Sequence, residues 1–150
     1  MLLKNKKIVI FGVANKYSIA TGIAKSMHEQ GAELAFAYQN ERLQKNIKPI
    51  AEELGSEILI ECDVSNDSSI NQAFKDLTNK WNKFDGLVHS IGFAPADQLE
   101  GSFVDVTARE GFKIAHDISS YSFTALARAS KPFLNENAAL LTLTYLGSMQ

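Results

Sequence analysis

The order of hydrophobic and polar residues along the chain predicts strands that alternate with helices. Apolar runs of strand length occupy residues 8–11, 33–38, 58–61, 84–89 and 138–144. The first run is unbroken from Ile8 to Phe11, which is typical of a strand buried on both faces. Between the runs, apolar residues recur at helical spacing, which predicts helices over about residues 18–30, 41–53, 65–81 and 109–133.

Turn residues and apolar stripes define these helices further. Gly31 ends the first helix and Gly55 follows the second. The third helix begins in a stretch rich in N-cap residues, 65–69, and its apolar stripe consists of Ile70, Phe74, Leu77 and Trp81. The stripe of the fourth consists of Ile114, Ile118, Tyr121 and Ala125. We expect both stripes to be packed, Tyr121 either in the core or against another subunit.

Strands that alternate with helices imply an α/β fold with a parallel sheet covered on both faces. Right-handed crossovers restrict the topology to a doubly wound, Rossmann-like sheet, most simply in strand order 3-2-1-4-5. No repeat, low-complexity tract or linker divides the sequence. Residues 1–150 are therefore expected to form a single dinucleotide-binding domain that is C-terminally incomplete, because such folds add a sixth strand beside the fifth.

Composition narrows the class of protein. The 150 residues carry a net charge of −2 and give a pI near 5.9, so neither nucleic acid nor an anionic membrane is an expected partner. Cys62 is the only cysteine, which excludes a disulfide framework and fits a reducing compartment. Residues 1–7 have no signal-peptide pattern, and no apolar run reaches the roughly 20 residues of a membrane span. We therefore expect a cytoplasmic protein.

The first strand, its turn and the following helix have the pattern of a phosphate-binding cradle. Gly12 permits close approach of the backbone to a pyrophosphate, and the free amides at the helix start near Ser18 point toward an anion. Lys16 and Ser18 stand where the G-x-G-x-x-G fingerprint has further glycines, and the next glycine is Gly22. A plain strand–loop–helix connection therefore stays an alternative.

Gln39 is a candidate at the end of the second strand, because ligands of such folds lie beyond the carboxyl ends of the strands. It stands 27 positions after Gly12, where an NAD site commonly has an acidic residue for the ribose. Glutamine binds a ribose hydroxyl without repelling a 2′-phosphate, so the choice between NAD and NADP stays open. Arg42 would favour NADP if its side chain reached the site. The preferred interpretation is instead that Arg42 is exposed to solvent.

Two further strand ends supply candidates. Asp63 can accept from the exocyclic amine of adenine while the Val64 amide donates to the ring; alternatively, Asp63 only caps its loop. In the loop after the fourth strand, Gly92 permits close approach and Ile91 can pack on a ribose or nicotinamide face. A simple turn glycine is the alternative for Gly92.

The remaining candidates for a functional role are three histidines and Tyr145. His28, His89 and His116 have no metal-ligand spacing, so no metal site is expected. His89 ends a buried strand and is interpreted as structural, and His28 as solvated, whereas the sequence does not decide the role of His116. Tyr145 follows the fifth strand, where its phenol could donate a hydrogen bond as an acid or an oxyanion partner.

Together, these segments resemble the bacterial enoyl-acyl-carrier-protein reductases, a divergent family of short-chain dehydrogenase/reductases. The matching segments are Gly12 with Ser18-Ile19-Ala20, and residues 38–40, 62–64, 89–95, 109–123 and 140–147. They cover essentially the whole chain, and the altered glycine turn is that family's own version.

The resemblance implies hydride transfer from NADH to the β-carbon of a trans-2-enoyl thioester on acyl carrier protein, in fatty-acid biosynthesis, through a stabilised enolate. By motif match, the cofactor would be held by Gly12, Ser18, Ile19, Gln39, Asp63, Val64, Ile91 and Gly92. Ala94 would contact the substrate. Tyr145 would be the first of two active-site tyrosines and would contact substrate or supply a proton. The family also implies a homotetramer built partly on the 109–133 helix.

One departure from the family concerns the extent of the chain. The family's second tyrosine and its lysine, in a Tyr-x6-Lys pattern, follow Tyr145, and the sequence stops at Gln150 before either. We interpret the chain as the N-terminal part of a longer reductase and expect it to be inactive by itself. Two alternatives stay open: a carbonyl-reducing short-chain dehydrogenase, which would have a serine near Tyr145, and a non-catalytic dinucleotide sensor.

Overall fold

A five-stranded parallel sheet forms the centre of the molecule. The computed structural model describes residues 1–149. The strands are β1 (Lys7–Phe11), β2 (Glu33–Tyr38), β3 (Leu59–Glu61), β4 (Phe84–His89) and β5 (Leu134–Thr142). Their order across the sheet is β3-β2-β1-β4-β5, and every neighbouring pair is parallel. The predicted order 3-2-1-4-5 is confirmed.

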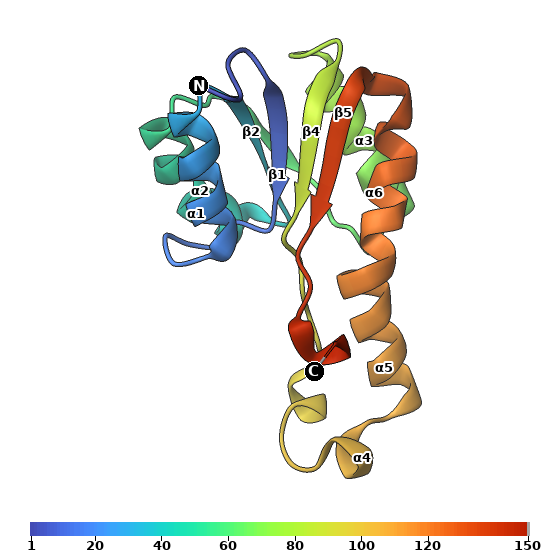
Figure 1. Cartoon of the computed structure of the whole chain (residues 1–150). Helices are drawn as coiled ribbons and strands as arrows, with labels where there is room; N and C mark the ends of the chain where they lie inside the picture. The colour runs from blue at the N-terminus through green and yellow to red at the C-terminus, as the bar shows by residue number, and fades with distance from the viewer. Residues whose placement is uncertain (150) are drawn as a thin grey trace.

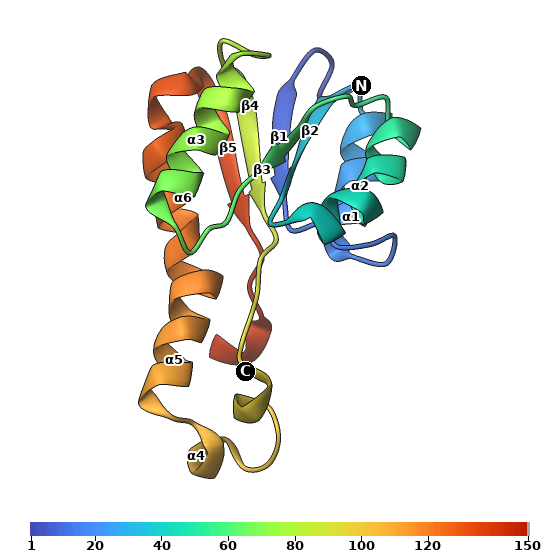
Figure 2. The ribbon, with the colours of Figure 1, turned by 180° about the vertical axis from the view of Figure 1, so that it is seen from behind.

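Helices cover both faces of this sheet (Figure 1, Figure 2). One face carries α1 (Ile19–Glu29) and α2 (Glu41–Glu53), and the other carries α3 (Asp67–Thr78) and α6 (Ser122–Ser130). Two further helices, α4 (Phe103–Val106) and α5 (Arg109–His116), extend past the carboxyl ends of the strands. The helical segments therefore continue beyond the edge of the sheet at which the strands end.

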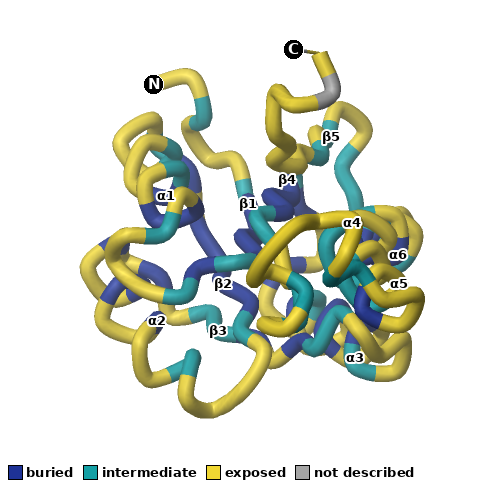
Figure 3. Tube along the Cα trace, turned by 90° about the horizontal axis from the view of Figure 1, so that it is seen from below, coloured by how far each residue is buried: buried dark blue, intermediate teal, exposed yellow. Residues whose placement is uncertain are grey.

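Strand side chains divide between two cores. Val9 and Phe11 pack on the α3 and α6 side, whereas Ile8 and Ile10 pack on the α1 and α2 side, because successive strand residues point to opposite faces. All four are at most 5% exposed. Figure 3 shows the buried segments gathered at the strands and the facing sides of the helices. The sequence prediction that the first strand is buried on both faces is confirmed.

The helices begin and end for local reasons that the sequence indicated. The Oδ1 atoms of Asn40 and Asn66 accept from the amides three residues later and cap α2 and α3. Gly31 and Gly55 follow the ends of α1 and α2 with positive φ angles. The predicted α3 stripe, extending to Trp81, is at most 5% exposed. Within residues 1–149, no helix combines the length and apolar character needed to cross a membrane.

The second half of the chain departs from the sequence prediction in its details. The predicted 109–133 helix consists of α5, the π-helical turn η2 (Asp117–Tyr121), α6 and the 3-10 turn η3 (Lys131–Phe133). Tyr121 on the predicted packed stripe is 42% exposed in the described chain. Two short helices, η1 (Ala96–Gln98) and α4, lie in the predicted connection before Thr107. The π-helical turn contacts a distant segment, because Ser119 is hydrogen-bonded to Phe93, 26 positions away, and the apolar pattern does not record such a contact.

The fifth strand starts and ends earlier than predicted. Pairing with β4 extends from Phe84 opposite Leu134 to His89 opposite Thr142, with an irregularity after Phe84. Backbone pairing, which the apolar pattern does not record, therefore sets these bounds. The final turn, η4, spans Leu146–Ser148. Tyr145 consequently lies three residues beyond the end of β5 rather than directly after it.

Candidate functional site

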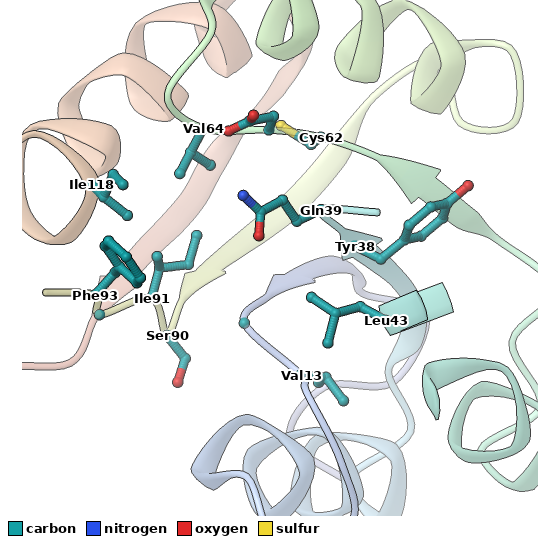
Figure 4. Close-up of a pocket in the computed structure, with 13 residues that line it drawn as sticks. Val13, Tyr38, Gln39, Leu43, Cys62, Val64, Ser90, Ile91, Phe93 and Ile118 are labelled. Atoms are coloured by element: carbon teal, nitrogen blue, oxygen red, sulfur yellow. The ribbon is translucent and has the colours of Figure 1, made fainter. Parts of the chain in front are cut away.

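The carboxyl ends of four strands surround a pocket of about 270 Å³ (Figure 4). It lies where the strand order reverses between β1 and β4, the usual ligand position in doubly wound sheets. The lining residues are Gly12, Val13, Tyr38, Gln39, Leu43, Cys62, Asp63, Val64, Ser90, Ile91, Gly92, Phe93 and Ile118. Apolar walls with a few polar groups are typical of a site for an organic cofactor or ligand.

Gly12 brings two strand ends into close contact at this pocket. Its φ is +104°, and a Cβ at this position would overlap the carbonyl oxygen of Ser90. The Ser90 amide donates to the Phe11 carbonyl at 3.0 Å, so the backbones after β1 and β4 stay adjacent. Only glycine combines this conformation with this approach. The close approach that requires glycine here is made to the Ser90 backbone, whereas the sequence analysis expected it toward a pyrophosphate.

The first helix begins with open amides. Ser18 is the N-cap residue of α1, yet its side chain caps no helix amide. Its Oγ instead accepts from the amides of Ala14 and Asn15, each at 3.1 Å, and thereby holds the preceding loop. Within residues 1–149, the amides of Ile19 and Ala20 donate no hydrogen bond. The positive end of the α1 dipole is thus available to an anion.

Gln39 extends from the end of β2 into the middle of the pocket, whereas the Tyr38 ring points away (Figure 4). The Gln39 amide can donate and accept, which suits a ligand that carries hydroxyl groups. Asn40 caps the next helix through a 3.1 Å bond from the Leu43 amide. Arg42 is exposed and does not line the pocket, in agreement with the interpretation that it is solvated.

Asp63 is partly engaged by its own loop. Its Oδ1 accepts from the amide and the hydroxyl of Ser65 at 3.0 and 2.7 Å, and its amide donates to Ser69 Oγ at 2.8 Å. Among the described residues, its Oδ2 makes no hydrogen bond and is free to accept from a ligand. Burial, assisted by the charge of Asp63, raises the pKa of Cys62 to about 12. This thiol in the pocket wall stays protonated at neutral pH and is a poor nucleophile.

His89 is a buried structural residue at the end of β4, as predicted. It is 1% exposed, and its Nε2 and Nδ1 lie 2.8 Å from Ser122 Oγ and Thr142 Oγ1. The Ser122 hydroxyl donates to the Ile118 carbonyl at 2.6 Å, so it accepts from Nε2–H, and the Thr142 hydroxyl donates to Nδ1. Burial, only partly offset by a backbone hydrogen bond, lowers the pKa of His89 and favours this neutral form.

The other two histidines lie away from this network. His28 is exposed on α1, as expected. His116 is exposed and stacks on Phe112, with ring centroids 6.0 Å apart. Within residues 1–149, no group of three or more possible metal ligands was found.

The pocket brings together six of the residues that the sequence singled out: Gly12, Gln39, Asp63, Val64, Ile91 and Gly92. Ser18, Ile19, Ala94 and Tyr145 do not line it. Ile19 is 70% exposed and Tyr145 is 88% exposed in the described chain. Ser18 and Ile19 contribute the neighbouring helix start.

Sequence reasoning missed several residues of the pocket wall. Val13 and Phe93 directly follow Gly12 and Gly92, so a survey of every residue after a strand end would have found them. Leu43 and Ile118 come from helical segments, and only the tertiary arrangement brings them to the strand ends. Ile118 was expected to pack on the long helix, and it also serves as pocket wall.

Comparison with known proteins then identifies the family. A family model described as enoyl-(acyl carrier protein) reductase matches residues 12–150. The chain belongs to this family. The enoyl-(acyl-carrier-protein) reductase (NADH) FabI of Escherichia coli strain K12 is 58% identical over 146 residues, which make up 97% of this chain and 56% of that protein.

Solved structures of this reductase family share the fold. The enzyme from Aquifex aeolicus matches with a TM-score of 0.96 at 46% identity, over 100% of this chain and 60% of its own. The enzyme from Anaplasma phagocytophilum, solved in complex with NAD, matches with a TM-score of 0.94 at 41% identity, over 100% and 57%. The chain therefore spans slightly more than half the length of these enoyl reductases.

Proposed function

We propose that the chain is the cofactor-binding part of an NADH-dependent enoyl-acyl-carrier-protein reductase of fatty-acid biosynthesis, and that residues 1–150 belong to one domain. The observation that carries the proposal is the meeting of Gly12, Gln39, Asp63 and Ile91 in one pocket beside the open start of α1. The family match and the likeness to a relative solved with NAD support this choice of cofactor.

The residues present fit the phosphate and ribose parts of such a dinucleotide. The Ile19 and Ala20 amides offer donors for a pyrophosphate, and Ser18 keeps the loop before them folded. Gly12 and Ser90, whose backbones lie close together, both line the pocket, so Gly12 exposes backbone there without a side chain between it and a ligand. Gln39 supplies an amide for the hydroxyls of the adenosine ribose.

The remaining pocket residues suit the two ring systems. The free Oδ2 of Asp63 and the Val64 amide can bind the polar edge of adenine. Ile91 offers an apolar face, and a Cβ at Gly92 would meet no atom within 4 Å, so the backbone there is open to a ring. The site thus has polar partners for the adenosine half and an apolar wall for the nicotinamide half.

When bound, NADH supplies the hydride that reduces the enoyl double bond at its β-carbon. The protein must then stabilise negative charge on the thioester oxygen, which requires a hydrogen-bond donor. We assign this donor to Tyr145, which contacts the substrate or supplies the proton from the segment after β5. Ala94, half-buried in the loop after β4, is assigned to the acyl thioester.

We further propose that the full-length protein is a cytoplasmic homotetramer that takes its enoyl thioester from acyl carrier protein. Support for assembly comes from the α5–α6 segment, where Phe112 is 54% and Tyr121 42% exposed. Large apolar side chains that stay exposed on one helical segment favour burial against another subunit.

The test is an assay of NADH oxidation by the full-length protein with crotonyl thioester. We expect NADH consumption that depends on the thioester and yields the saturated product. Normal NADH binding without reduction would instead support a dinucleotide sensor. Reduction of a 3-oxoacyl thioester in place of the enoyl thioester would support a carbonyl-reducing enzyme.

A further inference from the structure

One side chain fastens the loop after β4 to the helix beside it. Ser119 lies in the π-helical turn Asp117–Tyr121 between α5 and α6. Its hydroxyl accepts from the Phe93 amide at 2.9 Å and donates to the Phe93 carbonyl at 3.0 Å. Both polar backbone groups of Phe93 are thus satisfied by one hydroxyl that lies 26 positions away in the sequence.

These two bonds are the only hydrogen bonds that the backbone of residues 91–94 makes within residues 1–149. The nearest backbone anchors are the Ser90 amide, bonded to Phe11, and the Pro95 carbonyl, bonded to the Gln98 amide. Between these anchors, the loop would otherwise be held only by apolar contacts. The Ser119 hydroxyl therefore contributes much of the order of this loop.

The π-helical turn and the first residue of α6 place further side chains against the same strand end. Ile118 lines the pocket next to Phe93 and Ile91 (Figure 4). Ser122 accepts from His89 and donates back to the Ile118 carbonyl. Helices with a π turn carry one extra residue locally, and such turns frequently occur at functional sites. Here the turn lets neighbouring side chains contact both the end of β4 and the loop that follows it.

We propose that Ser119 is a positioning residue that holds the loop 90–95 in the conformation that binds ligand. This inference rests on the proposed function, in which Ile91 and Gly92 contact the cofactor and Ala94 the thioester. Phe93 stands between these two groups of residues, so one tether orders both parts. Removing the hydroxyl would let the loop sample other conformations, and whichever ligand binds first would then have to order it again.

The effect should appear in binding rather than in turnover. The cost of ordering about one residue corresponds to a rise of about tenfold in KM for NADH and for crotonyl thioester, each measured with the other ligand well below its own KM, so that the other ligand does not order the loop first. Once both ligands are bound, the loop is ordered again, and kcat should change by less than about twofold. A purely structural role would lower the thermal midpoint without this separation of KM from kcat.

The experiment uses the full-length protein with Ser119→Ala, Ser119→Cys and Ser119→Thr. The alanine and cysteine variants should show the rise in both KM values, because a thiol is a weak hydrogen-bonding group, whereas threonine keeps a hydroxyl and should restore binding. Ser120→Ala is the matched control, because Ser120 is exposed and its side chain makes no hydrogen bond in the described chain. If the alanine variant does not fold, the KM values of the cysteine variant test the proposal.

Two results would overturn the proposal. One is a pair of KM values for Ser119→Ala and Ser119→Cys that match those of Ser120→Ala. The other is a failure of threonine to restore them. If the wild-type protein reduces no enoyl thioester, the proposed function fails, and the dissociation constant of NADH, measured by its fluorescence, still tests the tether in the same four variants.

Discussion

At the residue scale, Gly12 is a tightly restricted position at the edge of the pocket. Its positive φ disfavours every other residue, and a side chain would meet the backbone of Ser90 rather than a flexible group. Gly22, only ten positions later, is the opposite case: it lies within α1, and an added Cβ meets no atom within 4 Å. The two glycines therefore form a natural comparison.

Gly12→Ala should destabilise the full-length protein by about 3 kcal/mol, because β1 and β4 must separate at their carboxyl ends and the φ angle is strained. Gly22→Ala should be neutral or stabilising by up to about 1 kcal/mol, since alanine favours a helix. Urea unfolding measures both. Equal stabilities of the two variants would contradict the assigned role of Gly12.

His89 predicts a pH dependence of stability. Burial lowers its pKa in the folded protein below the value of about 6.5 expected in the unfolded chain. The unfolded state therefore binds the proton first, so the contribution of His89 is fully present above about pH 6.5 and declines as the pH falls from there toward the folded pKa.

His89→Gln should remove this decline and, at pH 8, cost about 2 kcal/mol, because Ser122 or Thr142 loses its partner. His28→Gln, on the exposed side of α1, is the control and should leave the pH profile of wild type unchanged. Unfolding curves between pH 5 and 8 in the full-length protein compare them. An unaltered profile in His89→Gln would refute the assignment.

At the element scale, Asp85 joins three strands at the edge opposite the pocket. Its Oδ2 accepts from the Lys7 amide on β1 at 2.9 Å, and its Oδ1 accepts from Asn135 Nδ2 on β5 at 3.0 Å and from Lys6 Nζ at 3.2 Å. Its side chain is only 12% exposed. Burial alone would raise the pKa of Asp85, but these hydrogen bonds outweigh it and lower the pKa.

The depressed pKa means that Asp85 stabilises the fold above the unfolded value of about 3.9, and that this contribution is lost as the pH falls through the folded pKa. Asp85→Asn should therefore cost about 1 to 2 kcal/mol at pH 7 and much less at pH 3. Asp97→Asn, at an exposed position in η1, should cost nothing measurable. Thermal unfolding at the two pH values distinguishes the variants.

At the scale of the whole molecule, β5 forms an edge of the sheet. Among the described residues it pairs only with β4, and Leu141 and Leu143 are 44% and 39% exposed. Unpaired backbone groups beside apolar side chains favour association between copies.

We therefore expect the polypeptide 1–150, produced by itself, to self-associate and to reduce no enoyl thioester. Size-exclusion chromatography with light scattering, dye binding and the NADH assay test this expectation, with the full-length protein as the control. A stable, active monomer of residues 1–150 would contradict it.

Much of the architecture could be predicted from the sequence. The apolar runs and glycines predicted β1, β2, β4 and the helices between them. These elements are predictable because a strand or helix with a buried face has apolar residues at a characteristic spacing in the sequence. Six pocket residues followed as well, since any residue directly after a parallel strand must lie at the same edge of the sheet. The family resemblance explained why Ser18 replaces a glycine of the usual fingerprint.

Only the tertiary structure decided the rest. The bounds of β5 depend on its pairing with β4, and Ile118 reaches the pocket because of where the helical segment crosses the strand ends. The tether from Ser119 to Phe93 joins positions with no pattern in common. The sequence by itself determined which residues are buried in strands and helices and where the turns fall. Only the tertiary structure decided which distant hydroxyl, amide and side chain come into contact, because those contacts depend on the arrangement of the whole sheet.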